Sequence, residues 1–259
     1  MTIVAVAGDA TTTTCVALAA SWPGDDDVVI VEADRTGGSL AGWLDTPSTP
    51  SLASIVSNVA ASPAEAAATI SSMIQRSASG IRFVAGPLRA VPARRSVDEA
   101  DAVVVPALAR TQRFLTLADV GRSPESLDHP FTRAAALTVV VHRQRASSAG
   151  ADAVRIERLV ESIELLTAAA SPVVLAVIGR SPFEPDDIVR HVEASVPGGL
   201  EQAVRLDDDP LAASVLAGRG GVSARRLGRL ALMRSAGAAA ALLATTVAER
   251  RQTRTEPPR

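Results

Sequence analysis

The stretch that decides the fold is residues 3–14, which read IVAVAGDATTTT. Residues 3–7 are a short apolar run that ends at Gly8, a pattern that predicts a buried strand. Apolar residues with helical spacing follow over residues 11–21, and residues 28–31 are a second apolar run that ends in an acidic segment. This order of strand, loop, helix and strand predicts the opening of a parallel α/β sheet.

The remaining apolar runs predict that the same alternation continues along the chain. Further strands are expected at residues 81–85, 114–118, 136–141, 173–178 and 203–206, and helices at residues 51–60, 63–75, 151–166, 185–196 and 223–251. Residues 98–110 are ambiguous, because the valines at 103–105 suit a strand whereas a helix through the stretch fits equally well. We therefore predict one α/β domain over residues 1–251, with a doubly wound, mostly parallel sheet flanked by helices, and a disordered polar tail over residues 252–259.

Composition narrows the class of protein. The chain has 259 residues, of which 47% are hydrophobic and only 2% aromatic, so we expect a core of aliphatic side chains. A formal net charge of -2 argues against a dedicated nucleic-acid binder, which is usually basic. Cys15 is the single cysteine, which excludes an intramolecular disulfide, and we expect it to be a small buried apolar side chain.

Two features favour a cytoplasmic location. The first residues lack the basic segment of a signal peptide and turn polar at once after a short apolar run. The longest candidate for an apolar span, residues 236–248, is shorter than the roughly 18–20 residues that cross a bilayer. We therefore expect a cytoplasmic protein, attached at most peripherally to a membrane or a cell pole.

Polar residues follow three of the predicted strands, at the edge where α/β sheets bind their ligands. They form the segments 8–14, 32–38 and 119–121. In the first segment four threonines open a helix, so hydroxyls and free amides gather at a helix N-terminus, which is a natural anion site. A phosphate-binding P-loop also needs glycines and a lysine that reaches the outer phosphates. This chain contains no lysine, because all 26 of its basic residues are arginine.

The three segments resemble the ParA/MinD family of P-loop ATPases, whose loop is of the type KGGxGKTTT and whose second strand ends in two acids separated by one residue. The resemblance extends more weakly over residues 1–245. Laid over the family loop without gaps, Ala7 and Gly8 take the glycine pair, Ala10 takes the last glycine, and Thr11 takes the Walker lysine. Val6 takes the position of the lysine that family members extend across a nucleotide-sandwich dimer.

The resemblance implies a site for ATP and Mg²⁺. Asp34 corresponds to the acid that orients the attacking water, and Glu32 matches the other acid of that strand end. Thr12 and Asp119, the acid of the Walker B strand, would hold the magnesium ion. The phosphates would lie against Gly8, Asp9, Ala10, Thr11, Thr12 and Thr13.

The substitutions in the loop argue against catalysis. Loss of one charge-assisted hydrogen bond costs about 1.5–3 kcal/mol, which is roughly 10- to 100-fold in affinity. Ala10 adds a β-carbon where the backbone approaches phosphate, and Asp9 adds a negative charge. We therefore expect little or no hydrolysis of ATP and weak binding of ATP and Mg²⁺ at most.

The family resemblance implies a positioning or assembly factor that docks a protein partner in pilus, secretion or cell-pole machinery, and the CpaE-like proteins of Tad pilus assembly are one relevant branch. An active ATPase of chromosome or plasmid partitioning, or of division-site placement, is the alternative, with an arginine in place of the lysine; Arg35 is one candidate. A homodimer is possible, but Val6 removes the usual cross-dimer contact, so another basis would be needed.

Simpler roles stay open for several residues. The threonines could only cap a helix, and Asp34 and Asp119 could be structural, pairing with Arg35 or Arg122. An arginine-rich stretch near the last helix could be a solvated face, or it could contact DNA or acidic lipids; it consists of Arg219, Arg225, Arg226, Arg229 and Arg234. The histidines lack metal-ligand spacing and are expected at the surface or in loops; they are His129, His142 and His191.

Overall fold

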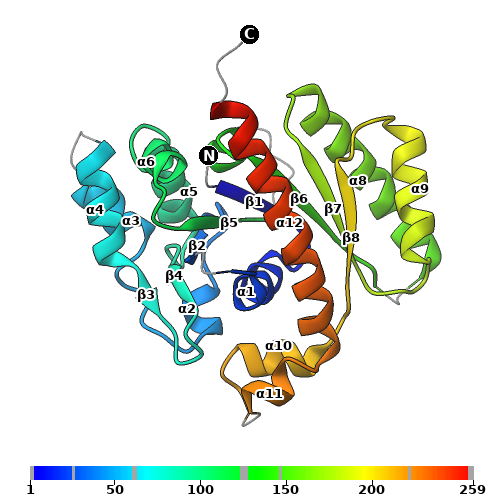
Figure 1. Cartoon of the computed structure of the whole chain (residues 1–259), viewed down its shortest axis with the longest axis horizontal. Helices are drawn as coiled ribbons and strands as arrows, with labels where there is room; N and C mark the ends of the chain where they lie inside the picture. The colour runs from blue at the N-terminus through cyan, green and yellow to red at the C-terminus, as the bar shows by residue number, and fades with distance from the viewer. Residues whose placement is uncertain are drawn as a thin grey trace.

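One twisted sheet organises the chain, in a computed structural model that describes residues 3–24, 27–59, 63–122, 128–145, 148–220 and 223–255. Within these ranges the strand order is β3-β4-β2-β5-β1-β6-β7-β8 (Figure 1). All neighbours pair in parallel except β3, which runs antiparallel to β4. The strands are β1 (Ile3–Gly8), β2 (Val28–Glu32), β3 (Gln75–Arg76), β4 (Arg82–Val84), β5 (Leu115–Gly121), β6 (Leu137–Arg143), β7 (Val173–Ile178) and β8 (Gln202–Leu206).

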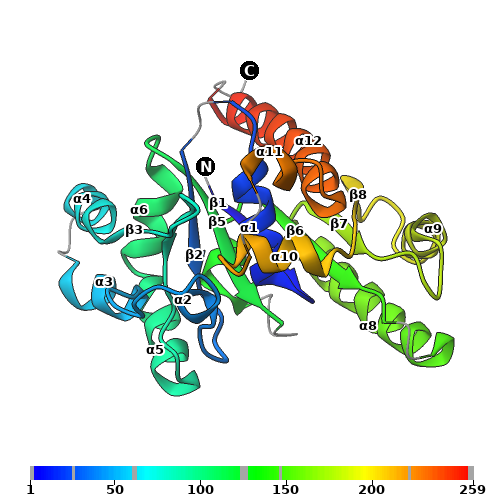
Figure 2. The ribbon, with the colours of Figure 1, turned by 90° about the horizontal axis from the view of Figure 1, so that it is seen from below.

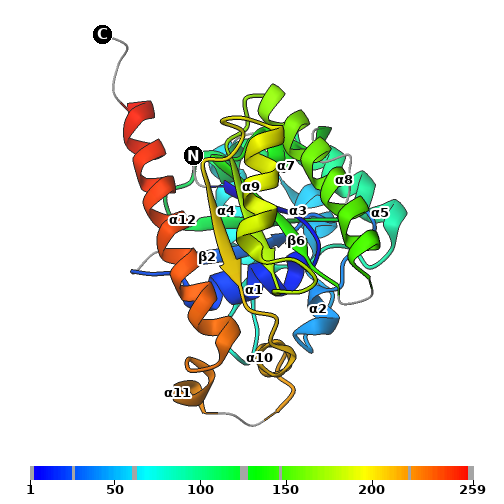
Figure 3. The ribbon, with the colours of Figure 1, turned by 90° about the vertical axis from the view of Figure 1, so that its right-hand side faces the viewer.

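Helices cover both faces of the sheet. One face carries α1 (Thr11–Ser21), α2 (Leu40–Trp43), α10 (Pro210–Leu216) and α12 (Ala231–Thr255), and α11 (Ala224–Leu227) lies between the last two along the chain. The opposite face carries α3 (Leu52–Asn58), α4 (Pro63–Met73), α5 (Ala90–Ala100), α6 (Val104–Arg110), α7 (Pro130–Arg133), α8 (Ala149–Ala168) and α9 (Pro185–Ser195). Figure 3 shows α12 on one side and α8 and α9 on the other. The predicted doubly wound, mostly parallel α/β fold is confirmed.

The core explains why the strands read as continuous apolar runs. Along β1, Val4 and Val6 pack toward α1 and α12, whereas Ile3 and Ala5 pack toward the helices of the other face, and all four are fully buried. A strand buried on both faces needs apolar residues at every position rather than at alternate ones. Cys15 lies in the first of these cores, fully buried, as expected.

The ambiguous residues 98–110 are helical. α5 ends at Ala100 and α6 begins at Val104, so no strand runs through 103–105. Pro106 is the third residue of α6, where a backbone amide has no intrahelical partner and proline is tolerated. The buried residues of α6 are Val104, Val105, Ala107 and Leu108.

Several boundaries differ from expectation. The helix predicted over residues 223–251 is divided into α11 and α12, and the break at residues 228–230 begins with Gly228, a residue of low helix propensity. The helix predicted over residues 63–75 ends at Met73, and Gln75–Arg76 instead extends the sheet as the edge strand β3. α12 continues to Thr255, so residues 252–255 of the predicted tail are helical, and residues 256–259 lie outside the described residues. Residues 249–252 are good helix formers, and the prolines that oppose a helix come only at 257 and 258.

By length and composition one helix of the described chain, residues 231–252 of α12, could cross a membrane. In the fold this helix has one buried face, which includes Leu232, Ala236, Ala240, Leu243 and Val247. That face packs on α1 and β8, so the apolar character of α12 has a core-forming role.

Candidate functional site

The loop between β1 and α1 lies at the carboxyl edge of the sheet, between the ends of β5 and β6. Gly8 has a φ of 107°, and a β-carbon there would lie 2.3 Å from the carbonyl oxygen of Val141 on β6. The amide of the next residue, Asp9, donates to that same oxygen at 2.8 Å. The loop therefore presses directly on β6, and only glycine fits at position 8.

Ala10 keeps the backbone shape of a glycine without being one. Its φ of 51° and ψ of 33° are left-handed, a conformation that costs an L-residue about 1–2 kcal/mol. Ala10 makes no side-chain cap for α1, which begins at Thr11, so the first amides of the helix are left open toward the loop. This is the local geometry of an anion site at a helix N-terminus.

The hydroxyl of Thr12 donates to Oδ2 of Asp119 at 2.6 Å, which joins the first turn of α1 to the end of β5. Asp119 is only 1% exposed, and burial raises the pKa of its carboxyl group. Hydrogen bonds from the Thr11 and Thr12 side chains lower the pKa of Asp119 and so oppose part of that effect. The structure thus brings together the threonine and the acid that the sequence predicts as magnesium ligands.

Thr11 stands where the family loop has its lysine. Its side chain is nearly buried, and it lies close enough to Asp119 to lower the pKa of that carboxyl group. Where the family has a lysine, this chain therefore has a short and nearly buried hydroxyl side chain. Val6, the other position that the resemblance assigns to a lysine, is fully buried in β1.

Asp34 lies at the end of β2 beside the same loop. Its Oδ1 accepts hydrogen bonds from the amide and the hydroxyl of Thr36, both at 2.7 Å, as in a turn capped by an aspartate. The carboxylate rests on Gly121, where a β-carbon would lie 2.2 Å from Asp34 Cγ. The charge of Asp34 is close enough to raise the pKa of Asp119. Asp34 and Asp119 are therefore neighbours, as predicted.

The suggested pairing of Asp34 with Arg35 is not what the geometry gives. The Arg35 guanidinium lies 2.6 Å from Asp98 on α5 and 3.4 Å from the carbonyl oxygen of Asp128. Its side chain is 11% exposed, so it is held against the protein and is not free to replace the missing lysine.

Glu32 has a structural role that the sequence pattern did not reveal. Its carboxylate is 1% exposed and accepts three backbone hydrogen bonds, from Ser39 at 2.5 Å, Leu40 at 2.7 Å and Gly86 at 2.8 Å. Burial raises the pKa of Glu32, and the three amides oppose that shift. Glu32 therefore ties the end of β2 to the start of α2 and to the loop after β4.

Asp9 is neutralised by arginines rather than left as a bare charge in the loop. Its carboxylate pairs with Arg155 of α8 and lies 3.4 Å from Arg122, which follows β5. Arg155 also binds Asp152 at 2.8 Å and the carbonyl oxygen of Arg143 at 2.8 Å. Nothing in the local sequence signals the pair of Asp9 with Arg155, which are 146 residues apart.

A pocket of about 290 Å³ opens beside the loop, on the side of α10. Ala10, Thr13 and Thr14 line one wall, and the acidic segment that follows β8 lines the other. In that segment Asp208 forms a two-pronged ion pair with Arg143, with contacts of 2.9–3.2 Å. The segment around Asp207 therefore lies near the loop.

The histidine prediction was wrong for His142, which lies in β6, whereas His129 lies in the loop before α7 and His191 lies at the surface. His129 is fully buried and His142 is 3% exposed, whereas His191 is exposed and pairs with Glu157 at 3.1 Å. His129 Nε2 lies 2.9 Å from the carbonyl oxygen of Ala33, and burial lowers the pKa of His129 to about 4. Among the described residues no cluster of acids, histidines and cysteine has the form of a metal site.

The residues of the site suit a magnesium ion better than they suit the phosphates of a nucleotide. A hydroxyl and a carboxylate oxygen, on Thr12 and Asp119, are the hard ligands that Mg²⁺ prefers. The open amides of α1 suit a phosphate. The loop itself has no basic side chain that could contact this phosphate, because Thr11 fills the lysine position. Two arginines beside the loop, Arg155 and Arg122, are paired with the carboxylate of Asp9. The arrangement suits an anion and a divalent cation.

Comparison with solved structures places this architecture. A ParA family ATPase from Chlorobium tepidum TLS superposes with a TM-score of 0.66 at 15% identity, covering 93% of this chain and 98% of that one. The cell division ATPase MinD of Pyrococcus furiosus gives 0.64 at 14% identity, covering 98% and 99%. A variant of Cyanothece McdA in complex with ATP gives 0.57 at 15% identity, covering 94% and 96%. No family model and no curated protein matches the sequence.

The sheet order, the loop after β1 and the acids at the ends of β2 and β5 define a P-loop type of α/β protein. Within that class, the chain has the fold of the ParA and MinD ATPases over nearly its whole length.

Proposed function

We propose that this chain is a ParA/MinD-like positioning or assembly factor that binds nucleotide weakly or not at all and does not hydrolyse it. One observation carries the proposal: the lysine position holds Thr11, a nearly buried threonine, in a chain without a single lysine. The magnesium half of the site persists as Thr12 and Asp119, so the loop acts as a scaffold rather than as a catalytic centre. In this proposal the protein acts by binding a partner protein of pilus, secretion or cell-pole machinery. It does so in the cytoplasm or peripherally at a membrane or cell pole.

Replacement of the lysine by an arginine finds little support. Arg35 is bound to Asp98, Arg143 to Asp208, and Arg122 and Arg155 to Asp9. Any of these four arginines would have to leave its carboxylate to bind a phosphate, which offsets much of the energy that the new contact would supply. Arg219, which also lines the pocket beside the loop, makes no ion pair within the described residues and is the arginine to which this argument does not apply.

Calorimetric titration with ATP and Mg²⁺ tests the proposal, together with a variant that rebuilds the loop. The chain itself is expected to show weak binding or none, and no turnover. Ala10→Gly combined with Thr11→Lys restores the glycine and the lysine, and should strengthen ATP binding by roughly 10- to 100-fold. Thr245→Lys, on the exposed side of α12, adds the same charge away from the loop and should change nothing. Micromolar binding by the unaltered chain, with turnover abolished by Asp34→Ala, would sink the proposal and favour an active ATPase.

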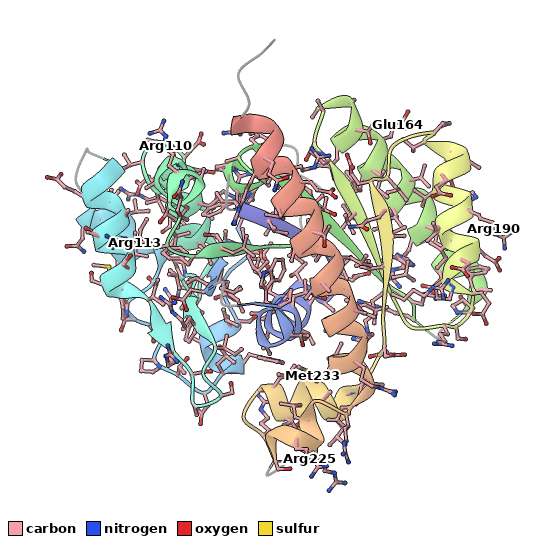
Figure 4. All side chains as sticks on the ribbon, in the orientation of Figure 1. Arg110, Arg113, Glu164, Arg190, Arg225 and Met233 are labelled. Atoms are coloured by element: carbon pink, nitrogen blue, oxygen red, sulfur yellow. The ribbon has the colours of Figure 1, made fainter. Side chains whose placement is uncertain are left out.

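A second candidate function rests on the arginine-rich stretch. Its five arginines, Arg219, Arg225, Arg226, Arg229 and Arg234, are all exposed, and none forms an ion pair within the described part of the chain. Figure 4 shows Arg225 at the end of the molecule formed by α10 and α11, pointing away from the sheet. This face suits DNA phosphates or anionic lipid head groups. The test is the binding of the chain to immobilised DNA at increasing salt concentration. Binding that weakens with salt and is lost in the double variant Arg225→Ala with Arg226→Ala would support this function, and binding that is unchanged in the double variant would contradict it.

A further inference from the structure

Among the described residues, no other element covers the outer face of α5, which combines apolar and charged residues. Val91 is 81% exposed and Leu88, just before the helix, is 60% exposed. A shallow groove passes over this face, lined by Ala90, Val91, Arg94, Arg95, Asp98 and Glu99. In Figures 2 and 3, α5 lies at the periphery of the molecule, on the opposite side from α12. The surface is therefore open to another molecule.

The charges on α5 are arranged against the dipole of their own helix. Arginines occupy positions 89, 94 and 95, and the acids follow at 98, 99 and 101. The first turn has no acid and the last turn has no base, although a helix favours acids at its start and bases at its end. This order is unfavourable for an isolated helix, and an antiparallel helix placed against it would supply the opposite order.

Each flank of the face repeats the same pattern. Residues four apart on a helix lie on one side, so Arg95 and Glu99 form one flank and Arg94 and Asp98 form the other. Arg95 and Glu99 are 2.7 Å apart within the chain, and Asp98 is bound by Arg35 but remains 52% exposed. Arg94 is exposed and makes no ion pair within the described residues. Both flanks thus run from basic to acidic along the helix.

We propose that α5 is a homodimerisation surface that pairs antiparallel with α5 of a second copy about a twofold axis near Ser96 and Val97. In such a pair equivalent surfaces meet, so a contact from one copy to the other occurs twice. Arg95 faces Glu99 of the second copy on one flank, and Arg94 faces Asp98 on the other. Val91 packs against the exposed Ala102 of the second copy along the centre. A parallel pairing would instead set arginine against arginine.

The proposed interface between the two α5 helices is small, so we expect a weak dimer. The face of an 11-residue helix buries much less than the roughly 1,200–2,000 Å² of a stable interface. The dimer is therefore weak, forms at high protein concentration and weakens with salt, because its ion pairs are exposed. It needs no nucleotide, so its test is independent of the function proposed above.

Sedimentation velocity over a concentration series, without nucleotide, tests the proposal with two variants in which charges on α5 are reversed. An acidic variant carries Arg94→Glu and Arg95→Glu, and a basic variant carries Asp98→Arg and Glu99→Arg. Each alone should be monomeric, with the dissociation constant raised by about 10-fold or more. An equimolar mixture should recover association as a heterodimer, because the two flanks become complementary again. Arg225→Glu with Arg226→Glu, remote from α5, should self-associate like the unaltered chain.

A single substitution at an exposed residue distinguishes loss of the dimer from loss of folding. Val91→Glu changes one highly exposed side chain, so it should leave the thermal unfolding midpoint unchanged while weakening the dimer by about 10-fold. Two results would overturn the proposal: an unaltered chain that stays monomeric at every concentration, or a mixture of folded acidic and basic variants that associates no better than either alone.

Discussion

The Thr12 hydroxyl lies 2.6 Å from Oδ2 of Asp119, although the two residues are 107 positions apart in the chain. This hydrogen bond connects the loop after β1 to the end of β5, two strands that are neighbours in the sheet. It spans the place where the resemblance puts a magnesium ion, so a bound cation would have to share or replace it. In the chain by itself, the bond stabilises a buried carboxylate.

Removal of the Thr12 hydroxyl should therefore destabilise the fold. Thr12→Val takes away a donor to Asp119, which is 1% exposed, and the expected loss is about 1–3 kcal/mol in the free energy of unfolding. Thr12→Ser keeps the hydroxyl and should remain within about 1 kcal/mol of the unaltered chain. Urea denaturation followed by circular dichroism measures both. Equal stability of Thr12→Val and the unaltered chain would mean that the bond contributes nothing.

Ala10→Gly should stabilise the protein, contrary to the usual effect of glycine. Ala10 has a φ of 51°, and glycine adopts this conformation without the cost of about 1 kcal/mol that alanine bears. Ala170 has a similar φ of 55° and lies between α8 and β7, far along the chain from the loop. Ala170→Gly is thus a matched control, expected to raise the melting temperature similarly without affecting nucleotide binding. A lower melting temperature for Ala10→Gly would show that the side chain has a compensating role.

Glu32→Gln should be more damaging than its conservative size suggests. The three amides of Ser39, Leu40 and Gly86 point at the two carboxylate oxygens, and an amide NH₂ would place a donor against at least one of them. The expected loss is about 1–3 kcal/mol, measured by urea denaturation. Glu99→Gln removes an exposed ion pair with Arg95 and should cost about 0.5 kcal/mol or less. If both variants lose equally little, Glu32 does not hold the loops together.

The sequence predicted the sheet well because its strands are buried on both faces. β1, β2 and β7 appear as apolar runs, and β5 and β6 as mostly apolar ones; acids or glycines mark the carboxyl ends of β2 and β5. Residues 98–110 could not be assigned for the same reason, because a short buried apolar run fits a strand or a helix equally well. The valines of this stretch belong to the buried side of α6.

The sequence indicated single residues of the candidate site and not their pairings. Thr12, Asp34 and Asp119 converge because the order of parallel strands brings their ends to one edge. The partners of Asp9 and Glu32 could not be read from the sequence, because Arg155 and Gly86 come from distant elements with no motif of their own. The burial of His129 was missed for the same reason, since its contact is with a backbone carbonyl oxygen.

His129 should make the protein less stable in acid. Burial lowers its pKa to about 4 in the folded chain, against about 6.5 when unfolded, so the unfolded chain binds more protons between these values. Stability should then fall as pH drops from 6.5 to 4, by about 3 kcal/mol for this group. His129→Gln retains a donor for the Ala33 carbonyl oxygen and binds no proton, so the slope of unfolding free energy against pH should become shallower. Burial also lowers the pKa of His142, which should preserve part of the slope. Urea titrations at several pH values between 4 and 7 measure the difference, and identical slopes for the variant and the unaltered chain would show that His129 does not resist protonation in the fold.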